Sequence, residues 1–108
     1  MNFEVYIPHV YVKYGRVRKQ NKRLRRKVCE KLIHKLSEHS GVVGVSVNKG
    51  YVRINCLSVY CKYTKISANI DSDAIEKIKN SGSLRVYMSV LKLNSLHIVV
   101  GDKLISVT

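Results

Sequence analysis

Residues 16–39 read RVRKQNKRLRRKVCEKLIHKLSEH, and this stretch predicts the longest helix of the chain. Apolar residues recur every four positions in it, which places them on one face of a helix: Leu24, Val28, Leu32 and Leu36. Ser40 and Gly41 follow and supply a stop signal. We therefore expect one helix over residues 16–39, with its core-facing side in the second half.

The first half of the same stretch is strongly cationic. No carboxylate interrupts a run of nine positive residues: Lys13, Arg16, Arg18, Lys19, Lys22, Arg23, Arg25, Arg26 and Lys27. The 108-residue chain has a formal net charge of +13 and a pI of about 9.9. Charge packed this densely repels itself unless an anion offsets it, and a phosphate backbone is the commonest such anion.

Strand patterns flank the long helix on both sides. Residues 3–14 are rich in Val, Ile and Tyr and predict a first strand, which Pro8 must interrupt or confine to an edge. Residues 42–56 predict a β-hairpin in which Lys49 and Gly50 form a two-residue turn. In that register the valines share one face, and Tyr51 and Arg53 lie on the other.

The second half of the chain predicts smaller elements. Residues 57–70 fit either a strand or a short helix, and residues 71–80 fit a short helix capped by Asp71 or Ser72. An alternation of apolar residues predicts a strand over 84–90, and two short strands follow at 96–100 and 104–107. The order is β-α-β-β-α-β with a C-terminal β extension, which is the ferredoxin-like order of an α+β fold, in a single domain over residues 1–108.

Two short stretches resemble the RNA-recognition-motif version of this order. Residues 5–10, VYIPHV, are similar to the aliphatic–aromatic–aliphatic pattern of that family's first strand, with His9 where Asn is expected. Residues 49–56, KGYVRINC, begin like its Lys-Gly-aromatic octamer and depart from it after Tyr51. The resemblance implies that bases stack on Tyr6 and Tyr51, while Lys49 and Arg53 contact phosphate or base.

A winged helix-turn-helix is the competing architecture. Residues 61–68 and 71–80 would form its two helices, and the strands from Leu84 onward would form the wing. Its second helix would carry Asp71, Asp73 and Glu76, which phosphates oppose.

Catalytic and metal-binding motifs are not evident in the sequence. The spacings of Cys56 with Cys61 and of His34 with His39 do not fit zinc pairs, and the acids are scattered. We expect no cofactor, no metal and no small-molecule substrate. Three cysteines without a signal peptide or an apolar run of membrane length predict a cytoplasmic protein that does not enter membranes.

The sequence therefore predicts a non-catalytic nucleic-acid-binding protein, with DNA favoured over RNA because a long basic helix suits a duplex groove. The expected binding residues are Arg16, Arg18, Lys19, Lys22, Arg23, Arg25, Arg26, Lys27, Lys49, Tyr51, Arg53 and Tyr6. The alternative is a protein–protein adaptor or inhibitor that docks on an acidic protein surface; small proteins of mobile genetic elements include both kinds. Strand edges near Tyr11 and Ile105 would allow a homodimer.

Overall fold

The computed structural model describes residues 1–54, 59–80, 82–93 and 96–107. The elements within these ranges follow one another along the chain in this order: β1 (Asn2–Pro8), β2 (Val10–Lys13), β3 (Arg16–Lys19), α1 (Lys22–Glu38), β4 (Val42–Ile54), β5 (Val59–Ile70), α2 (Ser72–Asn80), α3 (Ser83–Val90), β6 (Leu96–Val100) and β7 (Lys103–Val107).

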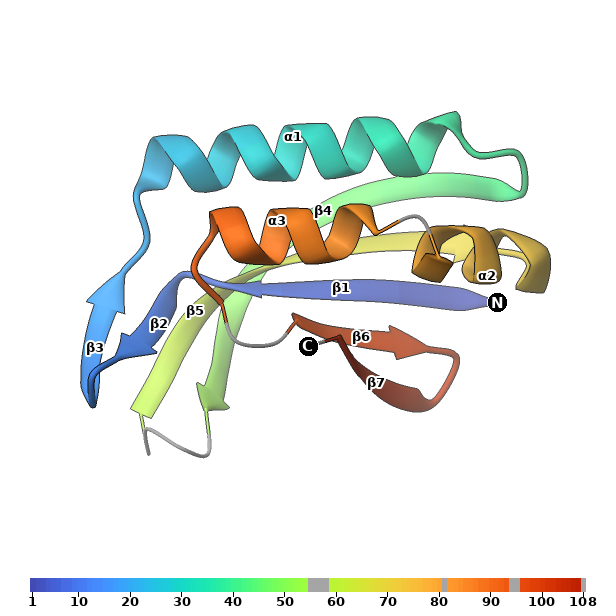
Figure 1. Cartoon of the computed structure of the whole chain (residues 1–108). Helices are drawn as coiled ribbons and strands as arrows, with labels where there is room; N and C mark the ends of the chain where they lie inside the picture. The colour runs from blue at the N-terminus through green and yellow to red at the C-terminus, as the bar shows by residue number, and fades with distance from the viewer. Residues whose placement is uncertain (55–58, 81, 94–95, 108) are drawn as a thin grey trace.

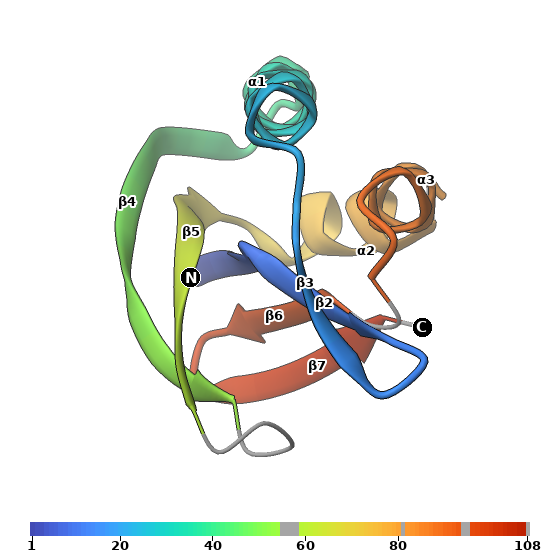
Figure 2. The ribbon, with the colours of Figure 1, turned by 90° about the vertical axis from the view of Figure 1, so that its left-hand side faces the viewer.

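Five of the strands form one antiparallel sheet in the order β4-β5-β1-β6-β7. The sheet curves around α1, α2 and α3, which all lie on its concave side (Figures 1 and 2). The remaining strands, β2 and β3, pair only with each other as a separate two-stranded ribbon. The molecule is therefore a mixed α+β fold, as the element pattern predicts.

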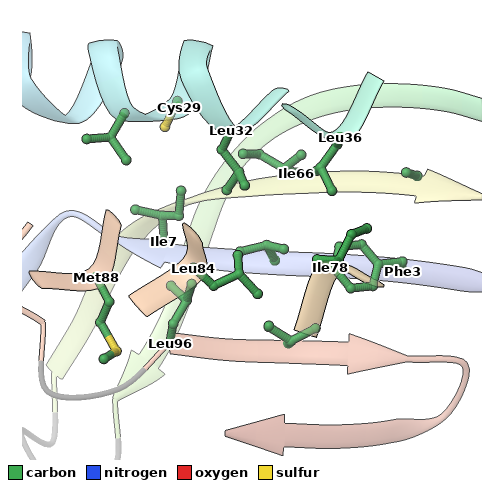
Figure 3. Close-up of a cluster of buried hydrophobic side chains, with 14 of the residues drawn as sticks. Phe3, Ile7, Cys29, Leu32, Leu36, Ile66, Ile78, Leu84, Met88 and Leu96 are labelled. Carbon is green, nitrogen blue, oxygen red and sulfur yellow. The ribbon is translucent and has the colours of Figure 1, made fainter. Parts of the chain in front are cut away.

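The hydrophobic core fills the space between the sheet and the helices (Figure 3). Alternate residues of β1 face it because successive side chains of a strand point to opposite sides, and Phe3, Val5 and Ile7 are at most 2% exposed. The helices contribute their apolar stripes, with Leu32 and Leu36 of α1 fully buried. The apolar stripe expected in the second half of the long helix is thus confirmed.

The predicted strand over residues 3–14 is interrupted, as Pro8 requires. The first strand ends at Pro8, and the His9 N–H donates to the Lys62 carbonyl at 2.9 Å. The chain then leaves the sheet and continues as β2. Proline has no N–H to donate, so the strand ends at Pro8, and the His9 N–H makes the last hydrogen bond to β5 before the chain turns away.

The predicted helix start at Arg16 is wrong, because residues 16–19 form β3. Tyr14 and Gly15 both adopt positive φ angles, +53° and +72°, and turn the chain between β2 and β3. Two positive φ angles in a two-residue loop are the requirement of a type I′ hairpin turn. Helix α1 begins only at Lys22, where the Asn21 side chain accepts a hydrogen bond from the Leu24 N–H at 3.0 Å.

The predicted turn at Lys49 and Gly50 is also wrong. Both residues lie in the middle of β4, opposite Thr64 and Tyr63 of β5, and the pairing of the two strands continues to Ile54 and Val59. The Tyr63 ring covers Gly50 so closely that a Cβ there would come within 3.0 Å of the tyrosine hydroxyl. This glycine leaves room for the ring of Tyr63 and does not form a turn.

Residues 59–70 form β5, which excludes the winged helix-turn-helix arrangement because that fold needs a helix over 61–68. The predicted strand over 84–90 is wrong as well, because these residues lie in α3. Within it only Leu84 and Met88 are buried, one helical turn apart. The predicted helix over 71–80 is confirmed as α2, and the last two strands are confirmed as β6 and β7. The pair Asn94 and Ser95 predicts a turn before the last two strands, and these two residues lie outside the part of the chain that the structure describes.

Candidate nucleic-acid interface

The cationic residues singled out in the sequence gather at one end of the molecule, where the ribbon and the start of α1 meet (left in Figure 1). The ribbon carries Arg16, Arg18 and Lys19, and all three are exposed. The first half of α1 carries the other five: Lys22, Arg23, Arg25, Arg26 and Lys27. Within the described part of the chain, no carboxylate lies at ion-pair distance from any of these eight side chains.

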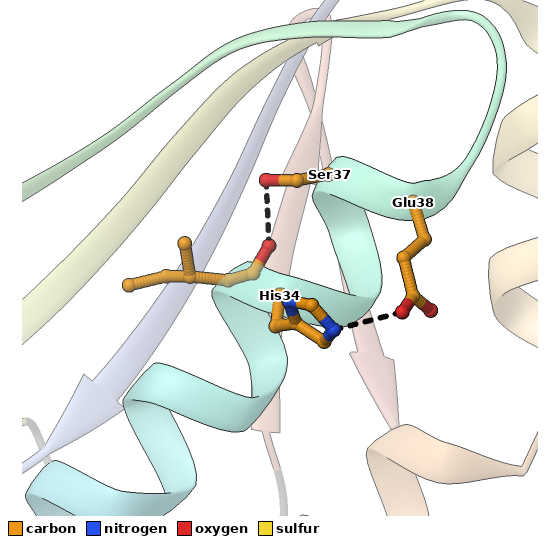
Figure 4. Close-up of polar contacts among 4 residues, drawn as sticks. His34, Ser37 and Glu38 are labelled. Atoms are coloured by element: carbon orange, nitrogen blue, oxygen red, sulfur yellow. Dashed lines mark hydrogen bonds and ion pairs between the residues drawn. The ribbon is translucent and has the colours of Figure 1, made fainter.

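The second half of α1 differs, because acids and bases alternate there. Glu30 and Glu38 accompany Lys31 and Lys35. His34 Nε2 lies 2.8 Å from Glu38 Oε1, and the Ser37 hydroxyl donates to the Ile33 carbonyl at 2.8 Å (Figure 4). Within α1, the unbalanced charge is therefore confined to the half that lies beside the ribbon.

A crevice of about 150 Å³ separates the first half of α1 from the sheet. Its lining comes from α1, β4 and β5: Lys22, Arg25, Arg26, Cys29, Glu30, Val47, Lys49 and Thr64. Four cations thus line one small space with a single carboxylate. Lys49 reaches it from mid-strand, so the structure brings this residue to the basic helix rather than to a hairpin turn.

His9 lies beneath this crevice and responds to its charge. The ring is 8% exposed, and its Nε2 lies 2.6 Å from the Thr64 hydroxyl oxygen. Burial, followed by the positive charges of Arg25, Lys62 and Lys49, lowers the pKa of His9 to about 4. His9 is therefore a neutral hydrogen-bonding residue at pH 7.

Two other residues of the crevice wall are affected by burial. Burial lowers the pKa of Arg25, which nevertheless stays charged because a free guanidinium titrates above pH 12. Burial also raises the pKa of the Cys29 thiol. A neutral thiol is a poor nucleophile, so Cys29 acts as a small apolar residue of the crevice wall, beside the charged Arg25.

Tyr6 lies on the face of the sheet opposite to the buried residues of β1. Its ring packs against Tyr63 with centroids 5.3 Å apart and planes inclined by 49°. Its hydroxyl donates to Glu4 Oε2 at 3.5 Å, and Lys65 Nζ lies 3.1 Å from the same oxygen. The backbones of Tyr51 and Arg53 lie in β4, but their side chains fall outside the described residues.

Sequence reasoning missed Tyr14 and the pair His9 and Thr64. Tyr14 is 91% exposed at the tip of the ribbon, and Lys13 Nζ lies 5.7 Å from its ring centroid. The dipeptide Tyr14-Gly15 between two basic segments was the available signal for a hairpin tip. No local pattern marks His9 and Thr64, because they are 55 positions apart.

The chain was compared with protein-family models, with curated proteins and with solved structures, and none of them matches it. Among the described helices, none combines the length and the apolar character needed to cross a membrane. The function is therefore argued from the geometry of the basic end alone.

Proposed function

We propose that this chain is a cytoplasmic, non-catalytic nucleic-acid-binding protein that contacts the phosphate backbone of DNA through its basic end. The carrying observation is the cationic crevice, where Lys22, Arg25, Arg26 and Lys49 converge from a helix and a strand. Like charges held together cost free energy, and a phosphate placed among them removes that cost. After burial, the charges of Arg25 and Lys49 also contribute to the lowered pKa of His9.

The exposed cations around the crevice extend the same surface. Arg23, Arg26 and Lys27 are solvent-exposed on α1, and Arg16 and Arg18 are exposed on the ribbon. Each phosphate that such a side chain neutralises releases condensed counterions, which drives binding at low salt. Charges held on a helix and a strand are also pre-ordered, so little conformational entropy is lost on binding.

We also propose a ferredoxin-like core for the sheet. The order β6-β1-β5-β4 supports it, since β5 lies between β1 and β4, and α1 connects those two strands. The resemblance to RNA-recognition motifs would then imply base stacking on Tyr6 and Tyr51, of which only the Tyr6 side chain lies in the described part of the structure. Glu4 contacts Tyr6 there, and a carboxylate opposes phosphate, so we assign the main contacts to the basic end.

A titration of a fluorescent 20-base-pair DNA duplex at several salt concentrations tests the proposal. The double variant Arg23→Ala/Arg26→Ala removes two exposed cations and spares Arg25, which is partly buried. We expect weaker binding and a salt slope smaller by roughly two units, about 0.9 for each lost phosphate contact.

The matched control is Lys77→Ala/Lys103→Ala, which removes the same charge from α2 and β7. It should bind like the wild type apart from a small general loss. If the two double variants bind equally well, the basic end is not the binding surface. If the wild type binds no tighter than a generic cationic protein, the adaptor hypothesis replaces this proposal.

A further inference from the structure

We infer that the β2–β3 ribbon enters the major groove of B-form duplex DNA, with Tyr14 at its leading tip. The inference rests on the proposed function and names the substrate class and the contact mode. Its starting point is that the ribbon stands outside the five-stranded sheet as a two-stranded unit (Figure 2). An isolated hairpin is marginal in water, so a stable exposed ribbon needs an anchor or a partner.

The base of the ribbon is anchored to the body of the molecule. The Gln20 backbone N–H donates to the His9 carbonyl at 3.0 Å, and the Gln20 side chain donates to the Leu91 carbonyl at 3.2 Å. Gln20 itself is 8% exposed. The ribbon is thus held in a fixed direction at its base, while nothing described covers its outer part.

One face of the ribbon carries repelling charges. Lys13 lies directly opposite Arg16, and Arg18 lies opposite Tyr11 on the same face. Like charges in directly opposed positions of two strands destabilise the pairing. In the described residues around the ribbon, no acid offsets these positive charges. DNA phosphates on either side of a groove would therefore relieve the repulsion between them.

The tip carries an aromatic residue that folding does not favour. Tyr14 has a φ of +53° and is 91% exposed. Type I′ turns prefer Asn-Gly, because positive φ disfavours residues with bulky side chains and Asn tolerates it. Neither the turn nor the core explains a tyrosine here, whereas a base edge offers its ring a thymine methyl and its hydroxyl a hydrogen-bond partner.

The dimensions of the ribbon fit the major groove. Each strand has four residues, which at about 3.3 Å per residue reach about 13 Å. The major groove of B-form DNA is about 8.5 Å deep and 12 Å wide and admits a two-stranded ribbon, whereas the minor groove is about 6 Å wide. The major groove of A-form RNA is too narrow for side chains to read, which separates DNA from RNA.

The test uses the full chain and three nucleic acids of one sequence: a DNA duplex, an RNA duplex and a single DNA strand. Tyr14→Asn removes the aromatic tip and suits the turn better, so the ribbon keeps its shape. We expect about tenfold weaker binding to the DNA duplex, little change for the single strand, and a thermal midpoint at or above that of the wild type.

Dimethyl sulfate reactivity identifies the groove. Saturating wild-type protein should protect guanine N7, which lies in the major groove, and Tyr14→Asn should protect it less. The ribbon inference would be overturned if Tyr14→Asn bound the DNA duplex as tightly as the wild type, or if guanine N7 stayed unprotected at saturation. Phosphate binding by α1 would still stand in either case. A failure of the proposed function is distinct, because then Arg23→Ala/Arg26→Ala also leaves duplex binding unchanged.

Discussion

The two halves of α1 belong to one continuous helix but differ in charge and burial. Residues 22–27 carry five cations and no acid, and their one apolar residue, Leu24, is 37% exposed. Residues 28–38 carry two lysines and two glutamates, and they bury Val28, Leu32 and Leu36 in the core. One helix therefore contains a half that stabilises the fold and a half whose charges are left for a partner.

The difference shows how a small protein can keep a strongly cationic surface. The hydrophobic burial of the second half holds the helix in place, so the first half need not contribute to stability. The repulsion within residues 22–27 is then a cost that the core offsets. Four experiments test whether the two halves of α1 differ in this way.

The largest expected effect is a core truncation in the second half. Leu32 is 2% exposed, so Leu32→Ala should lower the free energy of unfolding by about 3 kcal/mol through lost burial and a residual cavity. Leu24→Ala in the first half should cost about 1 kcal/mol or less. Urea unfolding of both variants measures the contrast, and equal losses would show that the first half also carries the core.

The next effect is a pH dependence that arises beneath the first half. The pKa of His9 is about 4 in the folded protein, against about 6.5 in an unfolded chain. The unfolded state binds the proton more readily, so this contribution is complete above pH 6.5 and is lost as the pH falls towards 4. Between pH 7.5 and 5.0 the free energy of unfolding should fall by about 2 kcal/mol.

Urea unfolding at those two pH values, repeated with His9→Asn, isolates the share of His9. Asparagine keeps a polar partner for Thr64 but does not titrate. The variant should show a clearly smaller pH dependence. A slope equal to that of the wild type would mean that other groups cause the loss and that the pKa of His9 is not lowered in the folded protein.

The contrast between buried apolar residues and exposed charged residues explains which elements the sequence could predict. The second half of α1, α2 and the terminal hairpin of β6 and β7 show strong periodicity or turn signals, and these elements agree with the structure. Val86 and Val90 extended a false alternation across residues 84–90, although both are exposed on α3 at 59% and 41%. A pattern of hydrophobicity does not state which of its members are buried.

The sequence predicted the positive charge of the basic end but not the elements that form it. Exposed cationic residues carry no burial period, so β3 and the first half of α1 were indistinguishable in the sequence. Gly50 suggested a turn because its neighbours in the sequence do not show that the Tyr63 ring of the paired strand β5 covers it. The crevice joins Lys49 to α1 by tertiary contact, which no local pattern encodes.

A smaller effect should come from anion binding in the crevice. Sulfate mimics a phosphate group, so we expect it to raise the free energy of unfolding by about 1 kcal/mol at concentrations several-fold above its Kd. Sodium chloride at equal ionic strength is the reference, because it screens charge without filling the site. Thermal unfolding in both salts provides the measurement.

Two lysine variants sharpen the sulfate experiment. Lys49→Ala removes one of the four cations that line the crevice and should abolish the excess stabilisation by sulfate. Lys103→Ala on β7 should retain that stabilisation. If both variants retain the sulfate effect, the anions bind elsewhere on the cationic surface and the crevice is not a phosphate site.

The smallest expected effect concerns the N-terminus of α1, where the first turn holds no acidic residue. Asn21 already caps the helix, and Asn21→Asp would keep that acceptor while adding a negative charge at the positive end of the helix dipole. We expect the free energy of unfolding to rise by about 0.5 kcal/mol, measured by urea unfolding at low salt.

The same substitution should weaken binding to the DNA duplex a few-fold, because the new carboxylate lies beside Lys22 and Arg23 and repels phosphate. Asn21→Ala is the control: it removes the cap and costs about 1 kcal/mol of stability without adding charge. If Asn21→Asp raises the stability and weakens DNA binding, the first half of α1 lacks a stabilising negative charge at a position where that charge would repel a bound anion. If the stability rises and DNA binding is unchanged, the anion site lies away from this end of the helix. The first half of α1 would then not be the half that binds a partner.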